Sequence, residues 1–228
     1  MGGLNVKITI VERVLQIIAP HPCYGCGKVG VLLCAYCKYD IKHEPYVGCF
    51  VCGEPEKSGI CDNHETSLER AFIVSKRADV LQKAIDGLKF SHTKACALVL
   101  AELLHESLPL LSPDTQIVPI PTVRSHIRQR GYDQVELIAR HFATLRGLSV
   151  ARAIQRVGVA TQHTADRATR QVQSREAFAF IPNTLNGGPV LLLDDIVTTG
   201  STLLAAAEVL KDVRAPLWAA ALAYQPLD

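Results

Sequence analysis

The sequence predicts an α/β protein in which a parallel sheet is flanked by helices and preceded by a small cysteine-rich module. The main observation is residues 190–193, an apolar run typical of a buried parallel strand. Two aspartates and a hydroxyl-rich turn follow it, and then a helical pattern begins. A second short strand, residues 116–121, is stopped by proline and leads into a basic segment. Seven of the eight cysteines lie within the first 61 residues.

The chain has 228 residues, which suits one α/β domain with a small addition. We expect a helix in residues 1–20, a cysteine-rich module in residues 21–66 and the α/β domain in residues 67–228. No apolar run is long enough to cross a bilayer, and Glu12 and Arg13 interrupt the apolar stretch near the start. We therefore expect a cytoplasmic protein that is not inserted into a membrane.

The cysteines of the module occur in pairs two residues apart. Each pair can present two thiolates to one tetrahedral ion, and two pairs complete a closed structural site. In a cytoplasmic chain this pattern favours metal over disulfides, so the module is expected to hold two structural zinc ions. The expected ligands are Cys23, Cys26, Cys34, Cys37, Cys49, Cys52, Cys61 and His64. Sequential pairing divides them into the first four and the last four, and interleaved pairing stays open. Cys96 stands apart and reads as a small buried apolar residue.

The other elements follow from the spacing of apolar residues. Residues 78–107 read as a long helical stretch with an interruption near residues 91–93. Further elements are expected as a basic loop at 124–134, a helix at 135–145, a strand at 149–154, a polar segment with Arg167 and Arg170 on one helix face, and a strand at 215–224 that closes the sheet.

The turn after the buried strand is the candidate ligand site. Open α/β sheets bind ligands at the carboxyl ends of their strands. Backbone N–H groups in such a turn can converge on an anion at the start of the following helix. The residues are Asp194, Asp195, Thr198, Thr199, Gly200, Ser201 and Thr202. Carboxylates beside an anion cradle favour a ribose 5-phosphate over a bare phosphate, because they can accept hydrogen bonds from the sugar hydroxyls. The alternative is a buried strand before an N-capped helix, which would leave two adjacent carboxylates without partners.

Positive charge is concentrated in residues 121–175. This segment holds ten arginines, no lysine and three acidic residues, a net charge of +7 in a chain whose formal net charge is +2. Arginine without lysine favours bidentate recognition of phosphates. The alternative, a solvated helix face, accounts for some of the arginines. In the cysteine-rich module the charges nearly cancel, which argues against that module binding nucleic acid by charge alone.

A series of motifs runs in a fixed order over nearly the whole chain. The turn at residues 190–203 resembles the phosphoribosyl pyrophosphate (PRPP) motif of type I phosphoribosyltransferases. It is preceded by the cysteine pairs, Gly-Leu-Lys-Phe at 87–90, Val-Pro-Ile-Pro at 118–121, Arg-Gly-Tyr-Asp-Gln at 130–134, Arg156 with Thr161 and Gln162, and Arg170 before Ala177 and Phe178. Together and in this order, the motifs resemble the ComF family of competence proteins. Asp133 stands where the family commonly has asparagine, and His64 where it often has cysteine.

The resemblance implies a type I phosphoribosyltransferase-like fold with an N-terminal double zinc-ribbon module. By resemblance, Asp194 and Asp195 hold the ribose hydroxyls and residues 198–202 hold the 5-phosphate. Lys89, Arg124 and Arg130 are the residues that the resemblance assigns to the pyrophosphate, and Mg²⁺ is expected to arrive with PRPP. The implied partners are single-stranded DNA and the cytoplasmic DNA-uptake helicase. No catalytic residue is assigned.

Three functions fit these motifs. The first is a ComF-like protein that handles single-stranded DNA during natural transformation. The second is an active phosphoribosyltransferase with an unidentified acceptor, although residues 161–174, where such an enzyme receives its second substrate, do not resemble a nucleobase pocket. The third is a PRPP-sensing regulator, for which the chain shows no separate effector domain.

Overall fold

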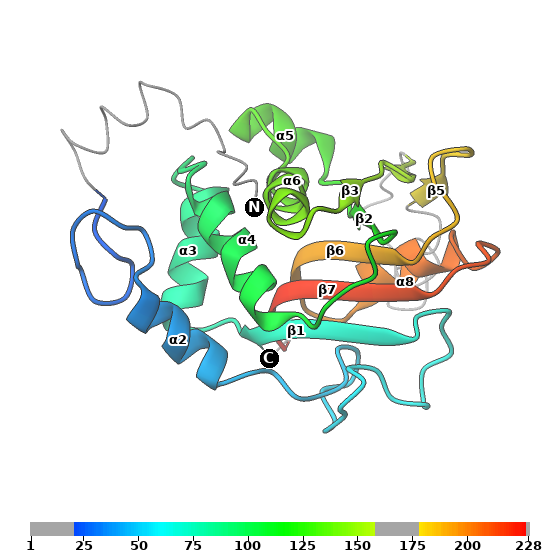
Figure 1. Cartoon of the computed structure of the whole chain (residues 1–228), viewed down its shortest axis with the longest axis horizontal. Coiled ribbons are helices and arrows are strands. Elements are labelled where there is room, and N and C mark those ends of the chain that lie inside the picture. The colour runs from blue at the N-terminus through cyan, green and yellow to red at the C-terminus, as the bar shows by residue number, and fades with distance from the viewer. Residues whose placement is uncertain (1–20, 158–177, 227–228) are drawn as a thin grey trace, which may run out of the picture.

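The computed structural model describes residues 21–157 and 178–226 of the chain (Figure 1). The helix expected in residues 1–20 and the helix face with Arg167 and Arg170 lie outside the described residues.

A parallel sheet of five strands, in the order β1-β7-β6-β2-β3, forms the centre of the structure. The strands are β1 (Arg70–Lys76), β2 (Gln116–Pro119), β3 (Ser149–Val150), β6 (Val190–Val197) and β7 (Leu217–Tyr224). A separate antiparallel pair joins β4 (Ile154–Arg156) to β5 (Phe178–Phe180). The internal position of β6 explains its unbroken apolar run, because both of its faces are covered.

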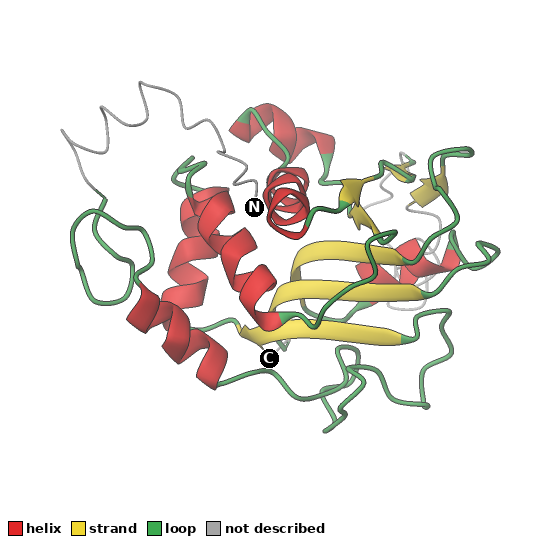
Figure 2. Ribbon diagram, in the orientation of Figure 1, coloured by secondary structure: helices red, strands yellow, loops and turns green. Residues whose placement is uncertain are grey.

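Helices cover both faces of the sheet (Figures 1 and 2). The helices α3 (Asp79–Lys89), α4 (Cys96–Ser107) and α6 (Gln134–Arg146) pack on one face, where Leu191 and Leu193 of β6 join their core. The helix α8 (Ser201–Glu208) packs on the other face, over Val190 and Leu192. This division follows from the strand itself, since successive side chains point to opposite sides.

The cysteine-rich part of the chain packs against both of these cores. Its helix α2 (Ala35–His43) lies beside α3 and α4, and Lys38 and Lys42 form ion pairs with Glu102 and Glu106 of α4. After α2 the chain crosses the edge strand β1, so that Cys49 and Phe50 belong to the core on the α8 side. The two halves of this cysteine-rich part therefore support opposite faces of the sheet.

The expected fold class is confirmed: the structure is a parallel α/β sheet flanked by helices, with a cysteine-rich N-terminal part. The expected helical stretch at 78–107 is indeed interrupted, and it forms α3 and α4. Two expectations are corrected. The basic segment begins as a helix, α5 (Arg124–Arg130), which has no buried residue and hence no apolar face that could have predicted it. The last strand, β7, lies inside the sheet between β1 and β6, because β1 was not expected. Phe178 and Phe180 lie in β5 of the small second sheet, where Phe178 is buried.

No helix among the described residues is both long and apolar enough to cross a membrane.

Candidate ligand site and metal centres

The turn between β6 and α8, residues 198–200, is the predicted anion-binding loop. Gly200 has a φ of +70° and forms the N-cap of α8, a left-handed conformation that glycine adopts without strain. Thr199 and Ser201 are linked through their hydroxyl groups at 2.9 Å. Residues 198–202 and Asp194 line one cavity of about 20 Å³, which is the space of a single water molecule. The structure thus brings Asp194 next to the loop, and the cavity between them is small.

The two aspartates have different environments. Asp195 is 6% exposed, and its Oδ2 atom lies 3.0 Å from Lys89 Nζ and accepts a hydrogen bond from Gln134 Nε2 at 3.3 Å. Asp194 accepts a hydrogen bond from the backbone N–H of Asp195 at 2.8 Å and borders the loop cavity. Asp194 is therefore placed to meet a ligand in the loop, whereas Asp195 holds α3 and α6 to the end of β6.

The carboxyl group of Asp194 is poised to take up a proton near neutral pH. Burial and the nearby charge of Asp195 raise its pKa to about 7, against the opposing charges of Lys89 and Arg156. Adjacent buried carboxylates cannot both ionise at their usual pKa, because each disfavours the charge of the other. The site can therefore exchange a proton at the pH at which a cell operates.

A chain of polar contacts joins the predicted pyrophosphate residues to β6. Arg130 donates from Nη1 to Gln134 Oε1 at 2.8 Å, and Gln134 in turn contacts Asp195, the partner of Lys89. The guanidinium of Arg130 also lies 5.7 Å from the centre of the Phe90 ring. The structure thus brings Lys89 and Arg130 to one place. Arg124 lies exposed at the start of α5, outside the contacts that these described residues make.

Asp133 positions this network from the first turn of α6. Its Oδ1 atom accepts hydrogen bonds from the backbone N–H groups of Val135 and Glu136, as an N-cap does. Both of its oxygens also bind Thr122, at 3.0 Å from the backbone nitrogen and 2.9 Å from the hydroxyl. The charge of Asp133 is therefore offset by the helix start, and its side chain ties the segment after β2 to α6.

Several arginines of the basic segment have structural partners. Arg140 and Arg152 both pair with Glu136. Arg156 donates to the carbonyl of Pro121 at 2.7 Å, and its guanidinium lies 4.8 Å from the centre of the Phe178 ring. Arg146 donates to the three carbonyls of His105, Leu108 and Pro109. Among the described arginines of this segment, Arg124 and Arg128 of α5 are exposed and have no such partner.

Two clusters of four ligands each fit a tetrahedral metal ion. They pair sequentially, as Cys23, Cys26, Cys34 and Cys37, and as Cys49, Cys52, Cys61 and His64. The Sγ atoms of Cys26 and Cys34 are 3.7 Å apart, and so are those of Cys52 and Cys61. A tetrahedron with metal–sulfur bonds of about 2.3 Å has edges of about 3.8 Å. The Nε2 atom of His64 is buried without a hydrogen-bond partner in the described residues, as expected for a nitrogen that binds an ion.

The first cysteine of each cluster is prepared to bind as a thiolate. Burial alone would raise the pKa of Cys23. Hydrogen bonds from the backbone N–H groups of Cys34, Cys26 and Gly25 outweigh that effect and lower this pKa to about 6. Cys49 shows the same balance, and its pKa is lowered. Each cluster could hold one zinc ion with four protein ligands and no open position, which is the pattern of structural rather than catalytic zinc.

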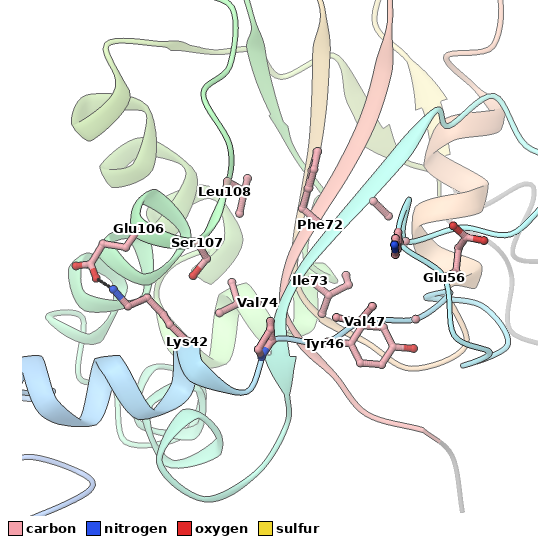
Figure 3. A pocket seen from close by; sticks show the side chains of 15 residues that line it. Lys42, Tyr46, Val47, Glu56, Phe72, Ile73, Val74, Glu106, Ser107 and Leu108 are labelled. Carbon is pink, nitrogen blue, oxygen red and sulfur yellow. Dashed lines mark hydrogen bonds and ion pairs between the residues drawn. The ribbon is translucent and has the colours of Figure 1, made fainter.

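A larger cavity lies elsewhere, along the edge strand β1. It has a volume of about 310 Å³ and is lined by residues of β1, the end of α4 and the segment around Tyr46 (Figure 3). Lys42 and Glu106 form an ion pair at its rim. None of the predicted ligand-binding residues lines this cavity.

The sequence did not single out Gln134 or Phe90 as site residues. Gln134 is 6% exposed and links Arg130 to Asp195, whereas Phe90 is 66% exposed beside Arg130. Both belong to motifs that the sequence analysis quotes, at 87–90 and 130–134. Membership of these motifs was the only sign in the sequence that they lie at the site.

No family model matches the chain, and no curated protein matches it in sequence. Parts of its structure are similar to solved adenine phosphoribosyltransferases. One from Trypanosoma brucei, solved with AMP, pyrophosphate and ribose-5-phosphate, has 13% identity and a TM-score of 0.41, over 66% of this chain and 70% of that one. One from Leishmania tarentolae has 12% identity and a TM-score of 0.39, over 61% and 76% of the two chains. One from Saccharomyces cerevisiae has 19% identity and a TM-score of 0.34, over 57% and 68%.

The clusters predict two zinc ions for each chain. Cys26→Ser and Cys52→Ser should each lower the zinc content by about one ion, because each removes one ligand from a different cluster. Elemental analysis of the purified proteins measures this. Cys96→Ser is the control, since Cys96 is buried outside both clusters and its replacement should keep both ions. Wild-type protein without zinc after purification in zinc-containing medium would contradict the assignment.

The raised pKa of Asp194 predicts a pH-dependent stability. Between its unfolded pKa of 3.8 and its folded pKa of about 7, the folded state holds the extra proton, so the free energy of unfolding falls as the pH rises through this window. Asp194→Asn removes the charge and keeps an oxygen for the N–H of Asp195. Its thermal unfolding temperature should exceed that of the wild type by a margin that grows from pH 5.5 to 7 and then levels off, by roughly 2–4 °C per kcal/mol relieved. A constant difference across this range would show that Asp194 has an ordinary pKa.

Proposed function

We propose that the chain is a PRPP-binding protein of the phosphoribosyltransferase type that handles single-stranded DNA, as its resemblance to ComF proteins implies. The observation that carries the first half is the shared cavity of Asp194 and residues 198–202 at the carboxyl end of an internal strand. The 5-phosphate would bind the loop, and the ribose hydroxyls would donate to Asp194.

The phosphate has favourable electrostatics at this place. The helix α8 begins directly after the left-handed turn at Gly200 and has no side-chain cap, so the N–H groups of its first turn and the helix dipole would favour an anion there. The cavity of about 20 Å³ is too small for a sugar phosphate, so binding requires the loop to widen. The Thr199–Ser201 hydroxyl contact is the bond that would break, and both hydroxyls would then donate to the phosphate.

The pyrophosphate would bind on the Asp195 side. Lys89 forms an ion pair with Asp195, and it can share its three N–H donors with an incoming diphosphate. Arg130 offers a bidentate guanidinium from the next element. Mg²⁺ would accompany PRPP and keep several of its waters, because Mg²⁺ sheds them reluctantly.

The second half of the proposal rests on the surface around α5. Phe90 is 66% exposed and the guanidinium of Arg130 lies over its ring, while α5 carries Arg124 and Arg128 with no buried residue. Proteins bind single-stranded nucleic acid through such a combination of exposed aromatic rings and positive charge. By resemblance, the setting would be natural transformation, with the cytoplasmic DNA-uptake helicase as a partner.

Titration calorimetry with PRPP, with and without Mg²⁺, tests the first half. We expect binding that Mg²⁺ strengthens, and a loss of at least about tenfold in affinity for the double variant Asp194→Asn with Asp195→Asn, since about 1.4 kcal/mol of lost hydrogen bonding has this effect. Asp212→Asn, an exposed aspartate outside the site, is the control. A double variant that binds like the wild type would show that the site is misassigned. Release of pyrophosphate from PRPP in a cell extract, lost in the double variant, would identify an active transferase instead.

Fluorescence titration with a labelled single-stranded oligonucleotide at several salt concentrations tests the second half. Affinity should fall steeply with salt, and Arg128→Ala should reduce the logarithmic slope by roughly 0.7. Phe90→Ala should weaken binding about tenfold at every salt concentration, because a stacked base contributes roughly 1–3 kcal/mol. Leu110→Ala removes another exposed apolar side chain, 96% exposed, and should leave the affinity unchanged. Binding that does not depend on salt would exclude this surface.

A further inference from the structure

The turn that carries two ligands of the second metal cluster packs directly against the β6–α8 loop. A Cβ atom built on Gly200 would lie 2.7 Å from two ring carbons of Phe50 and 3.2 Å from a methyl group of Val51. Phe50 is fully buried, and it stands between the ligands Cys49 and Cys52 in the sequence. Only glycine can occupy position 200, because the phenylalanine ring takes the space of a side chain.

Hydrogen bonds and the cluster together fix where the Phe50 ring lies. The backbone N–H of Gly53 donates to the carbonyl of Cys49 at 2.9 Å, and that of Phe50 donates to Gly59 at 2.9 Å. Cys49 and Cys52 lie on either side of the ring in the sequence, so an ion bound by both would hold the turn at its base. Without the ion, the three thiols and His64 would have no common partner to keep them together.

A second contact braces the same end of the sheet. Tyr46 stacks on Tyr224 with their ring centres 4.4 Å apart, and the Tyr46 hydroxyl donates to the carbonyl of Cys49 at 2.9 Å. Tyr224 pairs in the sheet with Val197, the last residue of β6 before the loop. The second cluster is therefore connected to both ends of the loop, through Phe50 at Gly200 and through Tyr46 at Val197.

The first cluster has no comparable position. Its residues Cys23 and Cys37 belong to the core formed by α3, α4 and α6, on the opposite face of the sheet from Phe50. The chain thus contains two clusters of similar chemistry, of which only the second touches the loop among the described residues.

We propose that Phe50 is a positioning residue for the anion loop, and that the metal ion of the second cluster controls the shape of the loop through it. With the ion bound, the ring holds Gly200 in its left-handed conformation, and the N–H groups at the start of α8 converge. When the ion is lost, the turn loosens, the ring leaves Gly200 and the N–H groups no longer share one direction. The part of this inference that concerns ribose 5-phosphate rests on the proposed function.

Hydrogen–deuterium exchange of the full chain without ligand tests the coupling by itself. Cys52→Ser and Cys26→Ser are a matched pair, since each removes one exposed ligand from one cluster. Residues 198–204 should exchange at least about fivefold faster in Cys52→Ser than in the wild type, and at the wild-type rate in Cys26→Ser. Equal acceleration in both variants, or none in Cys52→Ser after verified loss of one zinc ion, would overturn the proposal.

Titration with ribose 5-phosphate tests the positioning role. Phe50→Ala should keep two zinc ions and bind about tenfold more weakly, and Phe50→Leu should recover part of the loss. Phe142 is an equally buried phenylalanine in the core on the other face, so Phe142→Ala should lower the unfolding temperature as much and leave the affinity unchanged. If an alanine variant does not fold, Phe50→Leu and Phe142→Leu give the same comparison. Equal losses of affinity in the Phe50 and Phe142 variants would show that Phe50 acts only through the general stability of the fold. If the wild type does not bind ribose 5-phosphate, the proposed function fails, and the exchange experiment still decides the coupling.

Discussion

The structure around the candidate site depends on one buried ion pair, between Asp195 at the end of β6 and Lys89 at the end of α3. A carboxylate that is 6% exposed needs an opposite charge and hydrogen-bond donors, because water cannot solvate it. Lys89 supplies the charge and Gln134 supplies a donor, which requires α3 to end and α6 to begin at the same edge of the sheet. The loop before α6 is fixed in turn by Asp133. The positions of three elements thus follow from satisfying one carboxylate.

The same pair separates the functions of two residues that are neighbours in the sequence. Because successive strand residues face opposite sides, Asp195 turns towards α3 and α6, and Asp194 borders the loop before α8. One carboxylate, that of Asp195, is engaged by Lys89 and Gln134 within the fold. The other carboxylate, that of Asp194, is buried beside Asp195, and its burial and the charge of Asp195 raise its pKa to about 7. An adjacent acidic pair can therefore supply both a structural anchor and a group available to a ligand.

The sequence predicted the strand, the turn and the cysteine clusters because each is a local pattern. An unbroken apolar run, a glycine before a helix and ligand pairs two residues apart are visible without knowledge of the fold. The helix α5 was missed because it has no apolar face. The strand β1 was missed because it has only a short apolar run between charged residues. The sequence did not show which arginines have protein partners, because a partner such as the Pro121 carbonyl of Arg156 lies far away in the sequence. Gln134 and Phe50 matter through contacts of the same long-range kind.

The cysteine-rich part of the chain is more than an addition to the sheet, because its two clusters lie in different cores. The first is continuous with the helical layer, where α2 is also held by the ion pairs of Lys38 and Lys42 with α4. The second is continuous with the layer of α8, where Phe50 contacts the loop. Few large apolar side chains support either turn, so ligand geometry must replace packing in both places. The two sites have nearly the same ligands, but among the described residues only the second packs against the β6–α8 loop. This difference follows from where the chain crosses β1 and not from the coordination.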